Sequence, residues 1–91
     1  MVRIALFSDA FATEAGEIIV DKDMIRARYK DERVSAPLQY LADVALLEKG
    51  PLGKVRARID IYDVIGNKYS FDAMLSEGDF HTLRGFLKRK W

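Results

Sequence analysis

Two stretches of the chain alternate between apolar and polar side chains, which is the pattern of a β-strand buried on one face. They cover residues 24–29 and 55–64. In both, the polar positions are largely basic, and the outward-facing arginines are Arg26, Arg28, Arg56 and Arg58. Each stretch is therefore predicted to be a strand with an apolar inner face and a charged outer face.

Neighbouring runs predict further strands. Residues 17–20 are mostly β-branched, and residues 69–75 alternate between apolar and polar side chains. Polar turns of hairpin length follow the first run at residues 21–23 and precede the second at residues 65–68. Consecutive strands are therefore expected to pair antiparallel.

The N-terminal run, residues 2–12, is largely apolar and predicts a first strand whose better part is residues 7–13. Residues 13–17 then supply a turn, in which Gly16 is expected to take a positive φ. The next strand is predicted to begin directly after this turn.

Residues 33–49 are compatible with two structures. As a helix over residues 36–49, the segment would use Ser35 as its N-cap and would end at Gly50. The alternative is a strand, a turn and a second strand, over residues 33–38, 39–42 and 43–48. Local propensity favours the helix, because Ala, Leu, Gln and Glu are good helix formers.

The last segment is predicted to be a helix with a defined start. Ser76 and Asp79 have the spacing of a capping box, with Leu75 placed to begin a hydrophobic staple. The helix carries an apolar stripe that is expected to pack on the sheet, made of Phe80, Leu83, Leu87 and Trp91. Cations in its last turn, at residues 88–90, suit the helix dipole.

The chain has 91 residues, which fit a single domain, residues 1–91. The predicted fold is mainly β, with about six to seven antiparallel strands and one C-terminal helix. The alternative is an α+β fold with an additional helix at residues 36–49.

Composition narrows the class of protein. The net charge of +1 gives no strong field toward nucleic acid or membrane, and the absence of cysteine excludes disulfides and thiolate sites. No apolar run could cross a bilayer and no signal-peptide layout is present, so a cytoplasmic location is expected. Gln39 and Asn67 are the only side-chain amides, a composition typical of thermophiles.

The order of these elements resembles a pleckstrin-homology (PH)-like domain of the bacterial PH or GRAM type, over about residues 5–91. The positions that carry the resemblance are Gly16, Ile18, Val20, Asp21, Ile25, Pro37, Leu38, Leu41, Val44, Gly66, Tyr69, Phe71 and Trp91. The arrangement is also loosely similar to that of the archaeal taxis adaptor CheF. The resemblance implies a bent barrel closed by the last helix, working as a non-catalytic adaptor. It favours the two strands over the helix in residues 33–49.

Two departures from the family pattern bear on the ligand. Asp21 stands where Thr is usual, and the loop predicted at residues 13–17 is acidic. Phosphoinositide-binding PH domains carry Lys and Arg in that loop, so the resemblance implies a protein partner rather than a phosphoinositide. Such domains bind peptides at open sheet edges or in the groove beside the helix.

The candidate partner-binding residues are Arg26, Arg28, Arg56 and Arg58. If their strands lie together, the four arginines make one basic face for an acidic protein. The competing interpretation is an ordinary solvated face whose arginines pair across strands with aspartates. Nucleic acid is the alternative ligand, although Tyr62 is the one obvious outward aromatic for stacking.

No catalytic constellation, cofactor or metal site is predicted. His81 is the only histidine, so a metal would lack nitrogen and sulfur ligands. The carboxylates considered as a cluster are Asp60, Asp63 and Asp72. A small α+β enzyme subunit is a third hypothesis, and a homodimer contact through Phe86 and Trp91 is left open.

Overall fold

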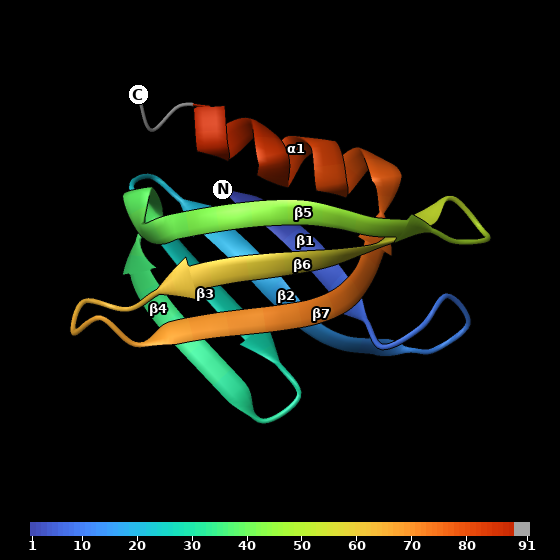
Figure 1. The fold of residues 1–91 in the computed structure, drawn as a ribbon, viewed down its shortest axis with the longest axis horizontal. Coiled ribbons are helices and arrows are strands. Elements are labelled where there is room, and N and C mark those ends of the chain that lie inside the picture. The colour runs from blue at the N-terminus through green and yellow to red at the C-terminus, as the bar shows by residue number, and fades with distance from the viewer. Residues whose placement is uncertain (89–91) are drawn as a thin grey trace.

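The structure is a computed structural model that describes residues 1–88 (Figure 1). These residues form seven strands, a short 3-10 helix and one α-helix. In chain order they are β1 (Val2–Phe7), β2 (Glu14–Asp21), β3 (Met24–Tyr29), β4 (Glu32–Pro37), η1 (Leu38–Tyr40), β5 (Leu41–Lys49), β6 (Lys54–Tyr62), β7 (Lys68–Ser76) and α1 (Glu77–Lys88). The prediction of a mainly β fold with one C-terminal helix is confirmed.

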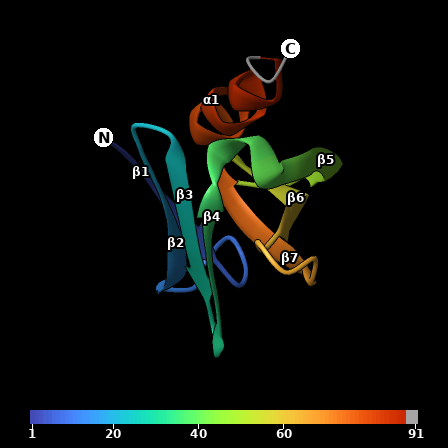
Figure 2. The ribbon, with the colours of Figure 1, turned by 90° about the vertical axis from the view of Figure 1, so that its left-hand side faces the viewer.

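The strands form one open antiparallel sheet in the order β4-β3-β2-β1-β7-β6-β5. We call β1–β4 the first meander and β5–β7 the second meander. Within the described residues, a single pair, Phe7 with Met74, joins the two meanders through β1 and β7. The sheet bends there, so the meanders stand as two facing walls with α1 across one end (Figure 2). The edge strands β4 and β5 each pair on one side only.

The core lies between the two walls and under the helix. Phe71 of β7 is 1% exposed and meets Tyr29 of β3 edge to face, with ring centroids 6.3 Å apart. Phe80 and Leu83 of α1 are also buried, which confirms that this part of the predicted stripe packs on the sheet. Trp91 lies outside the described residues. The cap is as predicted, since the Asp79 amide donates to Ser76 Oγ at 3.1 Å.

The segment that was compatible with a helix is extended. β4 ends at Pro37, η1 turns the chain, and β5 continues to Lys49, so the alternative α+β fold with a helix at 36–49 is wrong. Two tertiary contacts override the local helix propensity. The Leu38 amide donates to the Asp23 carbonyl at 2.6 Å, and Val44 pairs with Ile59 in the core.

The N-terminal strand is shorter than predicted. β1 ends at Phe7, and residues 8–13 form a loop in which the Asp9 side chain accepts a hydrogen bond from the Phe11 amide at 2.8 Å. This local hydrogen bond gives the backbone an alternative to pairing with a neighbouring strand. The apolar composition of the segment therefore predicts a strand where the structure has a loop. The predicted turn at 13–17 is also wrong, because β2 already begins at Glu14.

Gly16 is needed for space rather than for a positive φ. Only Gly53 and Gly66 have positive φ among the glycines of residues 1–88. A Cβ at Gly16 would lie 2.1 Å from the Arg28 carbonyl oxygen, so the close approach of β2 to β3 requires glycine.

Candidate functional site

The four predicted arginines all lie on outer faces but do not come together. Arg26 and Arg28 belong to β3, and Arg56 and Arg58 belong to β6. Three strands separate β3 from β6 in the sheet, and the bend turns the outer faces of the two meanders away from each other (Figure 2). The single basic face predicted for these residues therefore does not form.

Arg56 is held by the residues around it. Its guanidinium donates to Asp72 Oδ1 at 2.9 Å and to the Ser8 carbonyl at 3.2 Å, and lies 3.7 Å from Glu48. The hydrogen bond to Asp72 is the main cause that raises the pKa of Arg56. Arg56 therefore fastens the loop after β1 to the second meander.

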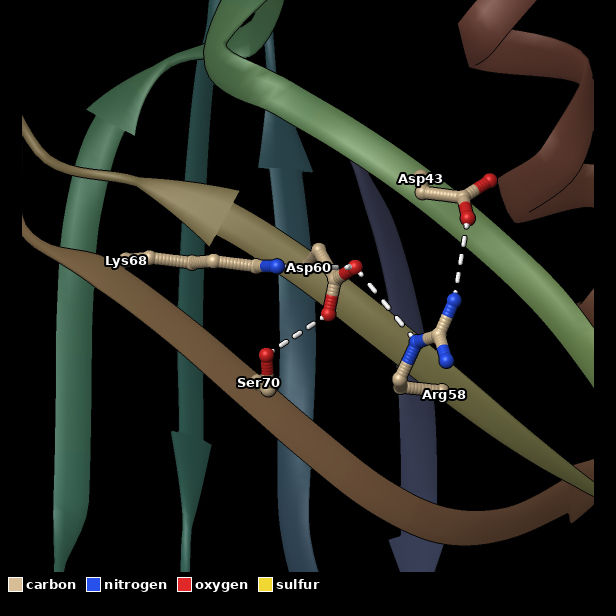
Figure 3. A network of polar contacts seen from close by, with 5 residues as sticks. All are labelled: Asp43, Arg58, Asp60, Lys68 and Ser70. Carbon is tan, nitrogen blue, oxygen red and sulfur yellow. Dashed lines mark hydrogen bonds and ion pairs between the residues drawn. The ribbon is translucent and has the colours of Figure 1, made fainter.

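Arg58 belongs to a network around a buried carboxylate (Figure 3). Asp60 is only 4% exposed, and it accepts a hydrogen bond from Ser70 Oγ at 2.7 Å. Arg58 Nε and Lys68 Nζ lie 3.5 and 3.8 Å from its other oxygen. Arg58 also reaches Asp43 at 3.4 Å. A buried charge is tolerated only when it is paired in this way, so Arg58 has a structural partner.

The arginines of the first meander are different. Within residues 1–88, neither Arg26 nor Arg28 has an ion pair, and the same holds for Arg33 of β4. Arg28 and Arg33 are direct cross-strand partners, and Arg26 is opposite Ser35. We call Arg26, Arg28 and Arg33 the arginine face. Sequence reasoning missed Arg33, although the two-residue turn at 30–31 could have placed it opposite Arg28.

A shallow concavity of about 460 Å³ lies on the arginine face, with Ile19, Ser35 and Glu17 also at its wall. Glu17 is the carboxylate nearest in the ladder, across from Arg28. Its carboxylate already has a partner, because Arg3 Nε donates to it at 2.7 Å. Hydrogen bonds from Arg3 to Glu17 and then to Glu14 raise the pKa of Arg3. Glu14 and Glu17, the acidic residues expected in a loop, are thus strand residues that both pair with Arg3.

The arginine face adjoins an unpaired strand edge. The Lys30 amide donates to the Ala15 carbonyl, and the Leu38 amide donates to the Asp23 carbonyl. These two bonds fix the alternation, that is, which residues of β3 and β4 point their peptide groups toward each neighbouring strand. In that alternation the peptide groups of Arg33 and Ser35 point away from β3, toward the free side of β4. Pro37, at the end of β4, has no N–H to offer. The N–H and C=O groups of Arg33 and Ser35 are therefore available to pair with another strand, next to the three arginines.

The other candidates have structural explanations. Desolvation acts to raise the pKa of Asp63, but hydrogen bonds from Asn67, Ile65 and Gly66 outweigh it and hold that pKa below its ordinary value. His81 is exposed on α1, 3.7 Å from Glu77. Within residues 1–88, no three histidine, aspartate or glutamate side chains are grouped so that they could hold a metal ion. The predicted carboxylate cluster is dispersed among separate contacts.

No protein-family model matches the sequence, and a search of curated proteins finds no similar one. No helix within residues 1–88 combines the length and apolar character that a membrane span requires. The geometry of the arginine face is therefore the basis for assigning a function.

Proposed function

We propose that this chain is a non-catalytic protein-binding module that holds an extended acidic segment along the free edge of β4. The observation that carries the proposal is the position of three arginines that have no ion pair within residues 1–88, beside the edge of β4 that no described strand pairs with. The resemblance to PH-like domains, which bind peptides at open sheet edges, also supports the proposal. The proposed ligand is a protein because backbone pairing suits a peptide strand.

Strand addition and charge would act together at this site. A peptide that pairs antiparallel with β4 uses the donors and carbonyls of Arg33 and Ser35, and Pro37 ends the pairing. Every second side chain of the peptide then points to the outer face, where the arginines lie. Acidic residues at alternate positions would meet the arginine face, and backbone bonds would set the register.

The two competing functions lack a comparable site. The nucleic-acid alternative relies on one face made of Arg26, Arg28, Arg56 and Arg58. Arg56 and Arg58 instead pair with Asp72, Asp60 and Asp43. An enzyme would need titratable groups that converge on a cleft. The carboxylates considered for that role serve ion pairs and a turn instead.

Amide hydrogen exchange measured by NMR tests the proposal. The probe is an acetylated seven-residue peptide that alternates Val or Thr with Glu. In the free protein the Arg33 and Ser35 amides should exchange quickly, and peptide should slow both, since they gain partners. The Val34 amide, which faces β3, is the internal control. Protection at β5 instead, or at no strand edge, would contradict the proposal.

A matched pair of variants tests the role of charge. Arg28→Glu combined with Arg33→Glu should abolish binding of the acidic peptide. Lys49→Glu combined with Arg84→Glu changes the net charge equally at exposed cations outside the first meander and should leave binding intact. Retention of the protein on immobilised DNA at low salt, lost when Arg56 and Arg58 are both changed to Gln but not in the first variant, would support the nucleic-acid alternative instead.

A further inference from the structure

The arginine face contains two like charges held directly opposite each other. Arg28 and Arg33 are cross-strand partners, and the alternation set by the Lys30 and Leu38 amides makes them a non-hydrogen-bonded pair. In such pairs the Cα atoms are about 4.5 Å apart and the side chains are closest. Like charges in this position destabilise a sheet. The fold therefore maintains an unfavourable pair that an anion would relieve.

The groups around this pair match the oxygen-rich surface of a phosphate. Arg26 lies on the same face, diagonal to Arg33, and Ser35 opposite Arg26 adds a hydroxyl. A guanidinium has five N–H donors, so two of them offer more donors than one carboxylate can accept. A phosphate monoester has three oxygens and a charge near −2, and it binds guanidinium groups in bidentate pairs. The site thus has more charge and donors than a glutamate would satisfy.

We infer that the anion bound between Arg28 and Arg33 is the phosphate of a phosphorylated serine or threonine in the partner strand. This inference rests on the proposed function, because the added strand on β4 brings the phosphate to the outer face. It goes beyond that function by naming a modification that would switch binding on. Glu17, the nearest carboxylate, is held by Arg3 and does not occupy the pair.

A membrane phosphate is a less suitable ligand for this surface. Membrane docking combines headgroup contacts with apolar side chains that enter the interface. Among residues 1–88, the most exposed large apolar side chains outside the N-terminus are Phe11, Ile65, Val64 and Leu52. All four lie in loops that do not line the arginine face. The unpaired peptide groups of β4 would also have no partner on a lipid.

The experiment compares two peptides against the full chain. Both are acetylated seven-residue Val/Thr peptides, one with a central phosphoserine and the other with glutamate at that position. At pH 7.5 the phosphoserine peptide should bind about tenfold more tightly, because the second phosphate charge adds charge-assisted bonds. Affinity comes from NMR titration of the Arg28, Arg33 and Ser35 amides.

The pH profile gives a second readout. The second ionisation of a phosphate monoester has a pKa of about 6, so the preference should shrink to about twofold or less at pH 5. The charged groups that face the phosphate are Glu17 of β2, Arg26 and Arg28 of β3, and Arg33 of β4. The glutamate peptide, measured in parallel, reports any titration of the protein itself. A preference that does not change with pH would overturn the inference.

Variants of single arginines test whether the preference for phosphoserine arises at the arginine face. Arg33→Gln should remove the preference for phosphoserine, and Arg58→Gln, an arginine already paired with carboxylates, should preserve it. Arg33→Lys keeps the charge but loses the bidentate geometry, so it should retain only part of the preference. Folding of each variant is checked by its amide spectrum.

The outcomes separate the two proposals. Equal binding of both peptides at β4 overturns the phosphate inference and leaves the proposed function standing. Binding of phosphoserine at the arginines without protection of the Arg33 and Ser35 amides supports the anion site but contradicts strand addition. Binding to vesicles containing phosphatidylinositol 4-phosphate, with no binding of either peptide, overturns both and assigns the site to a membrane.

Discussion

Each meander contains a strand that alternates apolar residues with outward arginines, but the arginines of the two strands have different partners. In the second meander, Arg58 lies across from Asp72 and beside the buried Asp60, and Arg56 lies across from Glu48. In the first meander, Arg28 lies across from Arg33 on β4 and from Glu17 on β2, and Glu17 is paired with Arg3 instead. The difference lies in the strands that pair with β3 and β6 rather than in β3 and β6 themselves. An outward arginine on a strand therefore points to function only when its cross-strand neighbours leave it without an available carboxylate.

This difference also separates stability from binding. The arginines of the second meander help hold the fold, since they pair with a buried carboxylate and fasten a loop. In the first meander, the like-charge pair Arg28 and Arg33 is expected to cost stability, and it lies in the proposed binding site. Strained or unfavourable arrangements that the rest of the fold sustains are typical of binding regions.

The largest effect is expected where the two meanders share a core. Phe71→Ala removes a buried ring that contacts Tyr29 across the core and should lower the free energy of unfolding by about 3–5 kcal/mol. Chemical denaturation followed by circular dichroism measures this change. Phe71→Leu, which keeps most of the volume, should cost much less. Separate unfolding transitions for the two meanders would contradict the single shared core.

The close approach within the first meander can be broken with one methyl group. Gly16→Ala would place a Cβ against the Arg28 carbonyl, a backbone atom that cannot move aside alone, and should cost about 3 kcal/mol. Gly85→Ala in α1 is the matched control, since a Cβ at this position would have no atom within 4 Å beyond its neighbours in the helix. That variant should gain about 0.5–1 kcal/mol. Thermal unfolding of both variants provides the comparison.

The carboxylate network of the second meander should tolerate loss of its exposed member but not of its buried one. Asp60→Ala leaves Arg58, Lys68 and the Ser70 hydroxyl without their shared acceptor and should cost about 2 kcal/mol. Asp43→Ala removes an exposed ion pair and should cost less than about 0.5 kcal/mol. Equal costs, measured by denaturant unfolding, would show that burial of Asp60 is not what gives the network its importance.

In the first meander, removing a charge should help the fold. Arg33→Gln eliminates the like-charge pair and should raise the free energy of unfolding by about 0.2–1 kcal/mol. The gain should shrink in high salt, which screens exposed charges. Arg26→Gln, opposite Ser35, is the control and should change stability little. A loss of stability in Arg33→Gln would show that the arginine has a favourable role within the fold.

The smallest expected effect is the response of the turn after β6 to acid. The folded-state pKa of Asp63 lies below its ordinary value of 3.8. Its ionised form is therefore stabilised by folding, and this contribution is complete above the unfolded pKa and lost as pH falls through the folded one. An NMR titration of the side-chain carboxyl measures the shift. Asp63→Asn should flatten the acid end of the stability curve.

Much of the fold follows from the sequence because its strands and helix carry clear periodicities. The strand around Ile25 and the cap at Ser76 are fixed by local pattern and local hydrogen bonding. Residues 7–13 could not be assigned correctly, since their apolar composition hides a loop that Asp9 stabilises. For residues 36–49, pairing between β5 and β6 decides the structure, and no local pattern reports it.

The candidate site was predictable only in part. Periodicity correctly placed Arg26 and Arg28 on an outer face, but it could not show that β3 and β6 lie on different walls. Strand register decides which arginines find carboxylates, and register depends on turn lengths and pairing across the whole sheet. Arg33 shows the limit most clearly, because its importance comes from its partner Arg28 rather than from its own surroundings in the sequence.

The narrow junction between β1 and β7 makes this domain suited to fragment complementation. Because one residue pair joins the two ladders within the described chain, a break in η1 would produce pieces that each keep a complete meander. The pieces would recognise each other through apolar side chains such as Phe71 and Tyr29. Reassembly could then report the proximity of two fused proteins.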